Sequence, residues 1–225
     1  MGTSRLFKLR NLFDFNGSIP MCMKTLIYGS SGISLLWCLC LATSIPLWAQ
    51  DSSTSGLHMY NPGKLKPLDS KLKVKVGDLA PDFKLRAVNG GAISLKQFRG
   101  KKNVVLSFVP AAFTPICSAQ WPGYNLVQDL FQKHNAALLG IATDNIPSLY
   151  AWTQEMGGIS FDVLSDFHPH GAVANSYGVL RGDGTAERAL FIIDKRGIIR
   201  YIDVHDINQR PALEDLVAAL DKLPK

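Results

Sequence analysis

Short apolar runs alternate with segments of helical periodicity along most of this 225-residue chain. Runs rich in valine, isoleucine, leucine and phenylalanine, bounded by glycine, asparagine or charged residues, predict strands. These strands are expected at residues 83–85, 92–95, 104–109, 136–142, 161–164, 189–194 and 198–204. Helices are expected at residues 115–134, 146–156, 171–177 and 211–220, with a helical turn at 95–98. Strands and helices alternate first, and a hairpin and a helix follow, which predicts an α/β fold.

Glycine-rich turns join two pairs of these strands directly. Asn89-Gly90-Gly91 lies between the first two strands, and Lys195-Arg196-Gly197 lies between the last two. Such short turns favour antiparallel hairpins. One hairpin is therefore expected at the N-terminal side of the fold and one near its end.

The residues before the first hairpin have a different composition. Residues 51–72 are rich in serine, glycine, proline, asparagine and lysine and show no apolar periodicity, which is typical of a tether or an irregular arm. We therefore expect a flexible N-terminal arm at residues 50–73 and a folded domain at residues 74–225.

Residues 1–49 are typical of a signal peptide for export. Lys24 precedes an apolar run at residues 33–42, and Leu47-Trp48-Ala49 supplies a candidate cleavage site. The run is short for a membrane span, but Leu47 is larger than the residue preferred near such sites, so a retained anchor is the alternative. The signal has an ordinary length if the chain starts at Met21 or Met23. The mature protein is expected to be exported, either periplasmic or extracellular.

Cleavage after Ala49 would leave a single cysteine. It would remove Cys22, Cys38 and Cys40, and only Cys117 would remain. An exported protein with one cysteine has no internal disulfide, so that thiol is either reactive or buried.

Composition and charge exclude several classes of function. The length and the 47% content of hydrophobic residues allow one domain with a full core and a tail. The net charge of +6 comes largely from lysines in the first part of the mature chain, which we interpret as a solvated surface. Without a nucleic-acid motif or interleaved aromatic residues, no nucleic-acid partner is expected. The five histidines show no spacing suited to a metal, so no metal site is expected.

The cysteine lies where an expected strand runs into an expected helix. Thr114 followed by Pro115 is the favoured pairing of an N-cap residue with proline at the first helical position. Cys117 then falls in the first helical turn, where free backbone N–H groups and the helix dipole favour the thiolate. A lone cysteine is more often a small core residue, but this position favours a nucleophile.

The segment Pro110–Cys117 fits the pattern Pro-x-x-x-Thr-x-x-Cys of the peroxiredoxins, which are thioredoxin-fold peroxidases. Residues 76–83 resemble the opening of that family, and residues 188–194 resemble its late strand. The chain thus resembles a one-cysteine peroxiredoxin over about its last two-thirds. The resemblance implies a thioredoxin-like fold, with a central mixed β-sheet flanked by helices and an N-terminal β-hairpin extension.

The resemblance also implies roles for four residues. The Cys117 thiolate would attack the peroxide, the Thr114 hydroxyl would position it, and Pro110 would shield the thiolate. By position, Arg188 would be the arginine that holds the charge, with Arg181 and Arg99 as alternatives.

One residue departs from the family pattern. Many peroxiredoxins have glutamate three residues after the cysteine, where this chain has Gln120. An amide accepts a hydrogen bond but brings no charge, so the arginine network is expected to be weaker or arranged differently.

The expected function is that of a thiol-dependent peroxidase that reduces hydrogen peroxide or organic hydroperoxides through a cysteine sulfenic acid. No cofactor is needed. The expected partners are the peroxide, an external thiol reductant, either a thioredoxin-like protein or a small thiol, and a second copy of the chain in a homodimer. The alternatives are an exported thiol–disulfide oxidoreductase and a non-enzymatic binding protein on the same fold. The former would use two cysteines two residues apart, and Thr114 occupies the place of the first.

Overall fold

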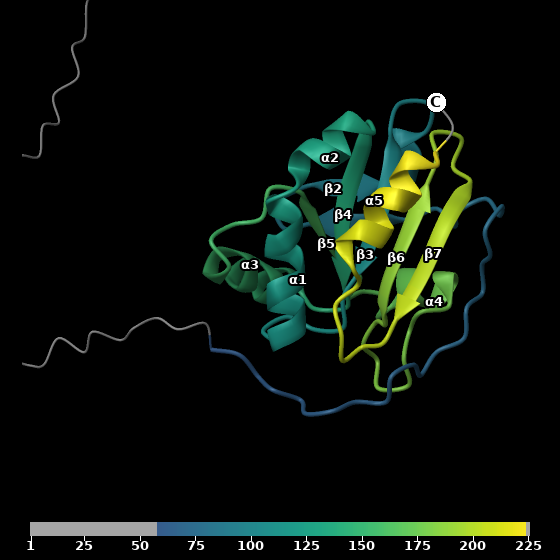
Figure 1. Ribbon diagram of the computed structural model, residues 1–225. Helices are drawn as coiled ribbons and strands as arrows, with labels where there is room; N and C mark the ends of the chain where they lie inside the picture. Colours follow the sequence, from purple (N-terminus) through teal and green to yellow (C-terminus); the bar gives the residue numbers. More distant parts are fainter. Residues whose placement is uncertain (1–57, 224–225) are drawn as a thin grey trace, which may run out of the picture. The chain divides into compact units, whose positions relative to one another are not determined.

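Seven strands form one mixed sheet in the order β2-β1-β5-β4-β3-β6-β7 (Figure 1). The computed structural model describes residues 58–223. The strands are β1 (Lys84–Ala87), β2 (Ala92–Ser94), β3 (Asn103–Phe108), β4 (Ala136–Ala142), β5 (Asp162–Ser165), β6 (Arg188–Ile193) and β7 (Ile199–His205). The central strands β3, β4 and β5 are parallel, and β6, β7, β1 and β2 continue the sheet antiparallel on either side. Together with the flanking helices, this sheet confirms the thioredoxin-like α/β fold.

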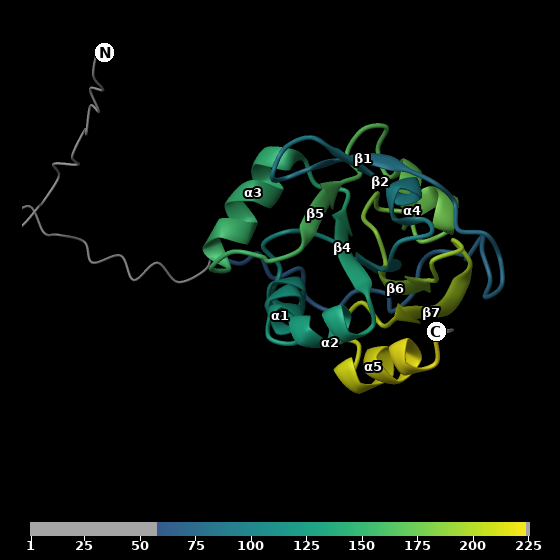
Figure 2. The same ribbon diagram turned by 90° about the horizontal axis from the view of Figure 1, so that it is seen from above.

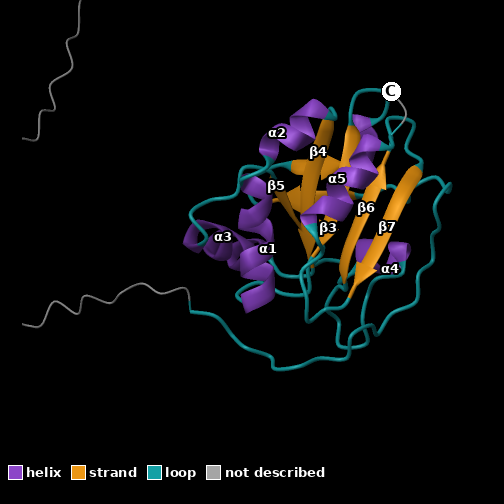
Figure 3. Ribbon diagram, viewed as in Figure 1, coloured by secondary structure: helices purple, strands orange, loops and turns teal. Residues whose placement is uncertain are grey.

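Helices cover both faces of this sheet (Figures 2 and 3). They are α1 (Pro115–Asn125), α2 (Gln128–Lys133), α3 (Ile146–Glu155), α4 (Ala172–Tyr177), α5 (Leu213–Asp221) and the short 3-10 helix η1 (Leu95–Phe98). Because side chains alternate along a strand, β3 contributes to two cores. Leu106 and Phe108 pack on the face covered by α4, whereas Val105 packs on the face covered by α1, α2, α3 and α5.

The elements agree with the expected ones to within one or two residues at most ends, but one expected helix is wrong. Residues 115–134 form two helices instead of one, with the break at Leu126 and Val127. The Asn125 side chain donates to the Gly158 carbonyl and accepts the Ser160 N–H, at 2.9 and 3.0 Å. These bonds to a distant loop hold the end of α1 in place, and the chain turns there before α2 begins.

Residues 58–73, which we call the strap, lie against the domain without forming a helix or strand. The strap runs along the lower edge of the domain in Figure 1. The Tyr60 N–H donates to the Phe113 carbonyl at 2.7 Å, and the Lys73 N–H donates to the Tyr177 carbonyl at 3.2 Å. The strap therefore connects the loop before α1 with the end of α4. Its composition gave no indication of these contacts.

The expected signal peptide, residues 1–49, and the first part of the expected arm lie outside the described residues. In the part of the chain that is described, no helix combines the length and the apolar character needed to cross a membrane.

Candidate active site

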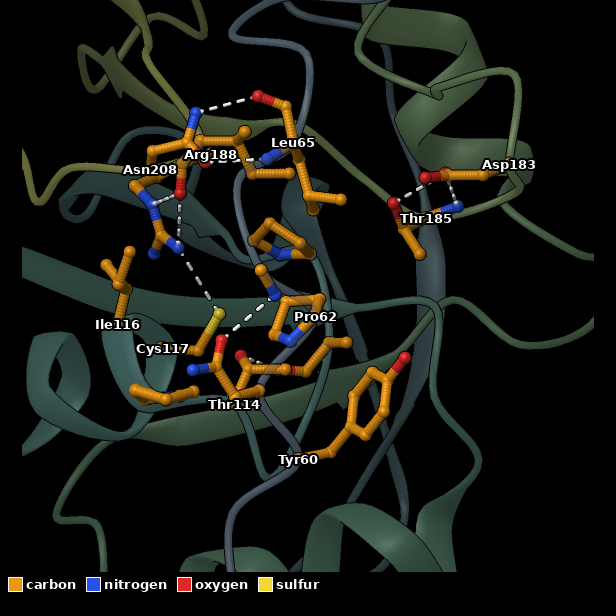
Figure 4. A pocket seen from close by; sticks show the side chains of 16 residues that line it. Tyr60, Pro62, Leu65, Thr114, Ile116, Cys117, Asp183, Thr185, Arg188 and Asn208 are labelled. Carbon is orange, nitrogen blue, oxygen red and sulfur yellow. Dashed lines mark hydrogen bonds between the residues drawn. The ribbon is translucent and has the colours of Figure 1, made fainter.

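Cys117 lies in the first turn of α1, just after the loop that follows β3 (Figure 4). Thr114 is the N-cap residue with an extended backbone, and Pro115 opens the helix, as the sequence predicts. The Cys117 side chain is buried, with only 1% of its surface exposed. The local sequence thus places the thiol at the positive end of the helix dipole, where an anion is stabilised.

The loop between β3 and α1 has a strained backbone at Phe113, whose φ of 56° lies in the left-handed region that L-residues rarely adopt. Two hydrogen bonds hold it. The Ala112 N–H donates to the Asp144 carboxylate at 3.1 Å, and the Phe113 carbonyl accepts the Tyr60 N–H of the strap. Burial raises the pKa of Asp144, and the bond from Ala112 acts in the opposite direction. This loop conformation turns the chain so that Thr114 can start α1.

The Thr114 hydroxyl does not cap the helix. It donates to the Ala111 carbonyl at 2.9 Å, and the side chain makes no capping bond. Thr114 therefore occupies the N-cap position, as predicted, but its side chain does not cap the helix. Because its proton is used within the loop, the Oγ1 lone pairs remain available to accept a hydrogen bond.

Arg188, the first residue of β6, brings a buried positive charge to the thiol. Its Nη2 lies 3.5 Å from the Cys117 sulfur, and the side chain is almost completely buried. Nε and Nη2 also donate to the Ile207 carbonyl at 3.3 and 3.1 Å, and Nη1 donates to Gln120 Oε1. Within residues 58–223 no carboxylate forms an ion pair with this guanidinium. The sulfur of Cys117 is thus the ionisable group that lies against this charge.

Gln120 orients this arginine through its own hydrogen bonds. Its Nε2 donates to the Tyr124 hydroxyl at 3.1 Å and to Ser107 at 3.4 Å, which leaves Oε1 to face Arg188. Burial raises the pKa of Tyr124 to about 12, so the phenol stays protonated. Apart from Cys117, the groups that accept hydrogen bonds from Arg188 are therefore neutral.

The two alternative arginines lie elsewhere. Arg181 is buried in an ion pair with Glu187, with Nη1 2.6 Å from the carboxylate, and its Nη2 donates to the Lys66 carbonyl. Arg99 is exposed, and its guanidinium lies beside Gly197. Of the three arginines, Arg188 is the one that contacts Cys117.

A cavity of about 380 Å³ opens above the thiol. All four residues expected at the site line it, three from the segment Pro110–Cys117 and one from the start of β6: Pro110, Thr114, Cys117 and Arg188. The rest of the lining is formed by Tyr60, Asn61, Pro62, Gly63, Leu65, Ala111, Pro115, Ile116, Asp183, Thr185, Ile207 and Asn208. The contributions from the strap and from Ile207 and Asn208 were missed, because neither segment carries a periodic pattern or a motif.

Trp121 belongs to the core beneath this site and does not line the cavity. Its ring packs so closely on β4 that a Cβ on Gly140 would lie 2.7 Å from it. The Trp152 ring packs against Trp121 at an angle of 37°, with 4.8 Å between centroids, and its indole N–H donates to Ser118 at 2.9 Å. These contacts fix the height of α1 above the sheet, and therefore the position of Cys117.

Metal ligands are not assembled at this site. Across residues 58–223, no group of three or more histidine, cysteine, aspartate or glutamate side chains is placed to hold a metal ion. The chemistry described below uses the side chains of the cavity itself.

Comparison with known proteins agrees with this geometry. The AhpC/TSA family matches residues 76–202, and the chain belongs to this family. The chain is 37% identical to alkyl hydroperoxide reductase E of Mycobacterium tuberculosis over 151 residues, which make up 65% of this chain and 98% of that protein. It is 35% identical to the chloroplastic 2-cysteine peroxiredoxin of Chattonella marina var. antiqua over 146 residues, 61% of this chain and 74% of the other.

A solved structure shows the same fold. The reduced 2-Cys peroxiredoxin of Plasmodium vivax superposes with a TM-score of 0.61 at 31% sequence identity, and the match covers 65% of this chain and 80% of that one. Family and fold together identify the chain as an enzyme of the peroxiredoxin class, a thiol-dependent peroxidase. The strap at residues 58–73 precedes the part of the chain that the family matches.

Proposed function

We propose that Cys117 is the nucleophile that reduces the peroxide. Its thiolate sulfur attacks the terminal oxygen of the hydroperoxide, and a sulfur–oxygen bond forms as the oxygen–oxygen bond breaks. Sulfur loses two electrons and becomes a sulfenic acid, and the leaving oxygen takes a proton from water and departs as an alcohol, or as water when hydrogen peroxide reacts.

The surrounding residues support each part of this step. Arg188 stabilises the thiolate before attack, and its guanidinium also faces the negative charge that develops on the oxygens. The Thr114 Oγ1 accepts a hydrogen bond from the peroxide and so orients it, since its own proton is held by the Ala111 carbonyl. Pro110 lines the cavity beside the sulfur and limits access of water to it.

Turnover requires a thiol from outside the chain. Cys117 is the only cysteine among the described residues, and cleavage after Ala49 would make it the only one in the mature protein. An external thiol would attack the sulfenic sulfur, release water and form a mixed disulfide, and a second thiol would then free Cys117. The N-terminal sequence pattern supports export, and the resemblance to peroxiredoxins supports a homodimer.

The observation that carries the proposal is the contact of 3.5 Å between Arg188 Nη2 and the Cys117 sulfur at the base of the cavity. Replacing Cys117 with serine tests it, because the side chains are similar in size and a neutral hydroxyl is a poor nucleophile. We expect the C117S protein to keep its circular dichroism spectrum and to lose consumption of hydrogen peroxide and of cumene hydroperoxide with dithiothreitol as reductant. Substantial remaining activity would refute the proposal.

A further inference from the structure

The strap forms one side of the active-site cavity, although it lies far from Cys117 in the sequence. Tyr60, Pro62 and Leu65 line the cavity together with Ile116 (Figure 4). Ile207 is a further lining residue. Pro62 and Leu65 are half-buried, and Ile207 is 4% exposed. A hydrogen peroxide molecule needs none of these apolar side chains, because it is polar on every side. We call this set of five residues the apolar wall.

Hydrogen bonds to the folded domain hold the strap in this place. The Leu65 N–H donates to Asn208 Oδ1, and Asn208 Nδ2 donates to the Leu65 carbonyl, both at 2.9 Å. The completely buried Glu187 accepts the N–H groups of Asp69 and Ser70 at 2.6 and 2.9 Å. A buried carboxylate that binds two backbone donors is a strong anchor. The strap is therefore fixed at Leu65 by Asn208 and again at Asp69 and Ser70 by Glu187.

The strap is also connected to the arginine of the site. The Ile207 N–H donates to the Pro67 carbonyl of the strap at 3.2 Å, and the Ile207 carbonyl accepts Nε and Nη2 of Arg188. The backbone of Ile207 therefore fixes the position of the strap, which carries part of the apolar wall, and also that of the Arg188 guanidinium, which faces the sulfur. The wall lies at a fixed position relative to the reacting atoms, as a specificity pocket requires.

The charged residues that line the cavity restrict which substituents of a hydroperoxide can bind there. Arg188 is buried against Cys117, and the other charged residue of the lining is the exposed Asp183. Asp183 pairs with Arg181, which does not line the cavity, at 3.7 Å, and the one cation of the lining, Arg188, faces Cys117. No cation of the lining is therefore left to stabilise an anionic substituent. An uncharged alkyl or aryl group would instead bury apolar surface against the wall.

We propose that the apolar wall is a substrate-specificity site, and that Leu65 of the strap selects uncharged organic hydroperoxides with a compact apolar substituent. This inference rests on the proposed function, in which Cys117 attacks the terminal peroxide oxygen. The substituent lies against Leu65, Pro62 and Ile207 while the hydroperoxide group reaches Cys117 and Thr114. Leu65 is then a specificity-determining residue that takes no part in the reaction of hydrogen peroxide.

Replacement of Leu65 with alanine tests the proposal, because it removes Cγ and both Cδ atoms and keeps the backbone bonds to Asn208. We compare kcat/KM for cumene hydroperoxide with kcat/KM for hydrogen peroxide. The ratio should fall about tenfold in Leu65→Ala, since a small change of apolar contact in a pocket alters specificity by about 10-fold or more. The matched control is Leu68→Ala: Leu68 lies on the same strap, is 48% exposed and does not line the cavity.

Several results would overturn the proposed role of Leu65. A ratio that changes less than twofold in Leu65→Ala, an equal loss for both peroxides, or a similar change in Leu68→Ala would overturn the inference. If the wild-type protein consumed neither peroxide, the proposed function would fail, and the wall would be tested separately by binding. In that measurement 2-phenyl-2-propanol, the alcohol product of cumene hydroperoxide, should protect Cys117 from iodoacetamide in the wild type and at least fivefold less in Leu65→Ala. Equal protection would overturn the inference.

Discussion

Replacement of Arg188 with methionine would remove the positive charge beside Cys117 and keep much of the side-chain volume. Arg188 Nη2 lies 3.5 Å from the sulfur, and both residues are buried, so water screens their interaction poorly. We expect the Cys117 thiolate to become less populated at neutral pH, because the cation that stabilises it is gone. Thiol chemistry proceeds through the thiolate, so alkylation of Cys117 should become slower.

The size of this effect follows from the distance. Two unit charges 3.5 Å apart attract each other by about 5 kcal/mol at an effective dielectric constant of about 20. Even if a quarter of that energy were effective, the ratio of thiolate to thiol would fall about tenfold, since about 1.4 kcal/mol corresponds to a factor of ten. We therefore expect the rate of alkylation by iodoacetamide, followed from neutral to acidic pH, to fall about tenfold in Arg188→Met in the range where the thiol predominates.

Two control variants separate the charge from other effects. Arg99→Met removes one positive charge from an exposed position and should leave the alkylation rate unchanged. Arg188→Lys keeps a cation and should recover part of the rate even though it cannot reproduce every hydrogen bond. An alkylation rate in Arg188→Met within twofold of the wild type, in a protein that is still folded, would refute the role of this arginine.

Three further predictions concern the loop, the helix position and turnover. Thr114→Val removes the hydroxyl that donates to Ala111, so peroxide consumption should fall at least tenfold and the free energy of unfolding in urea by about 1 kcal/mol; an unchanged rate would exclude the hydroxyl from peroxide binding. Gly140→Ala places a Cβ 2.7 Å from the Trp121 ring and should lower that free energy by about 1–3 kcal/mol, whereas equal stability would show that α1 can shift freely. Peroxide without reductant should leave a sulfenic acid on Cys117 that dimedone labels, as mass spectrometry can detect, and a disulfide between two Cys117 residues as the main product would contradict the one-cysteine cycle.

The order of strands and helices could be predicted from the sequence because the parallel strands at the centre of the sheet are apolar runs with clear ends. The apolar run at residues 136–142 has the same bounds as β4, and the turn at residues 89–91 joins β1 to β2 as expected. The break between α1 and α2 could not be predicted, because it depends on hydrogen bonds from Asn125 to a loop more than thirty residues away. Such long-range bonds leave no periodic pattern.

In the active site, too, the features that depend on local sequence could be predicted and those that depend on long-range contacts could not. Cys117 and Thr114 belong to one local motif, and their position at the start of α1 follows from the strand, the loop and Pro115. Arg188 could be named from the resemblance, but its contact with the sulfur depends on the pairing of β3 with β6. The strap was out of reach of sequence reasoning, because its polar composition is that of a tether and its anchors, Glu187 and Asn208, lie more than a hundred residues away.

The contact between the rings of Trp121 and Trp152 has an optical consequence. Both indoles are completely buried, one sits a single helical turn after Cys117, and the other donates to Ser118, the next residue along. A chain cleaved after Ala49 would contain no other tryptophan, so all of its indole emission would come from this pair. When Cys117 changes between thiolate and sulfenic acid, the charge beside the pair changes, and so does the electric field that sets the emission. In a chain cleaved in this way, we therefore expect the indole emission to report oxidation and reduction of the sulfur, so that a stopped-flow instrument could follow them without a label.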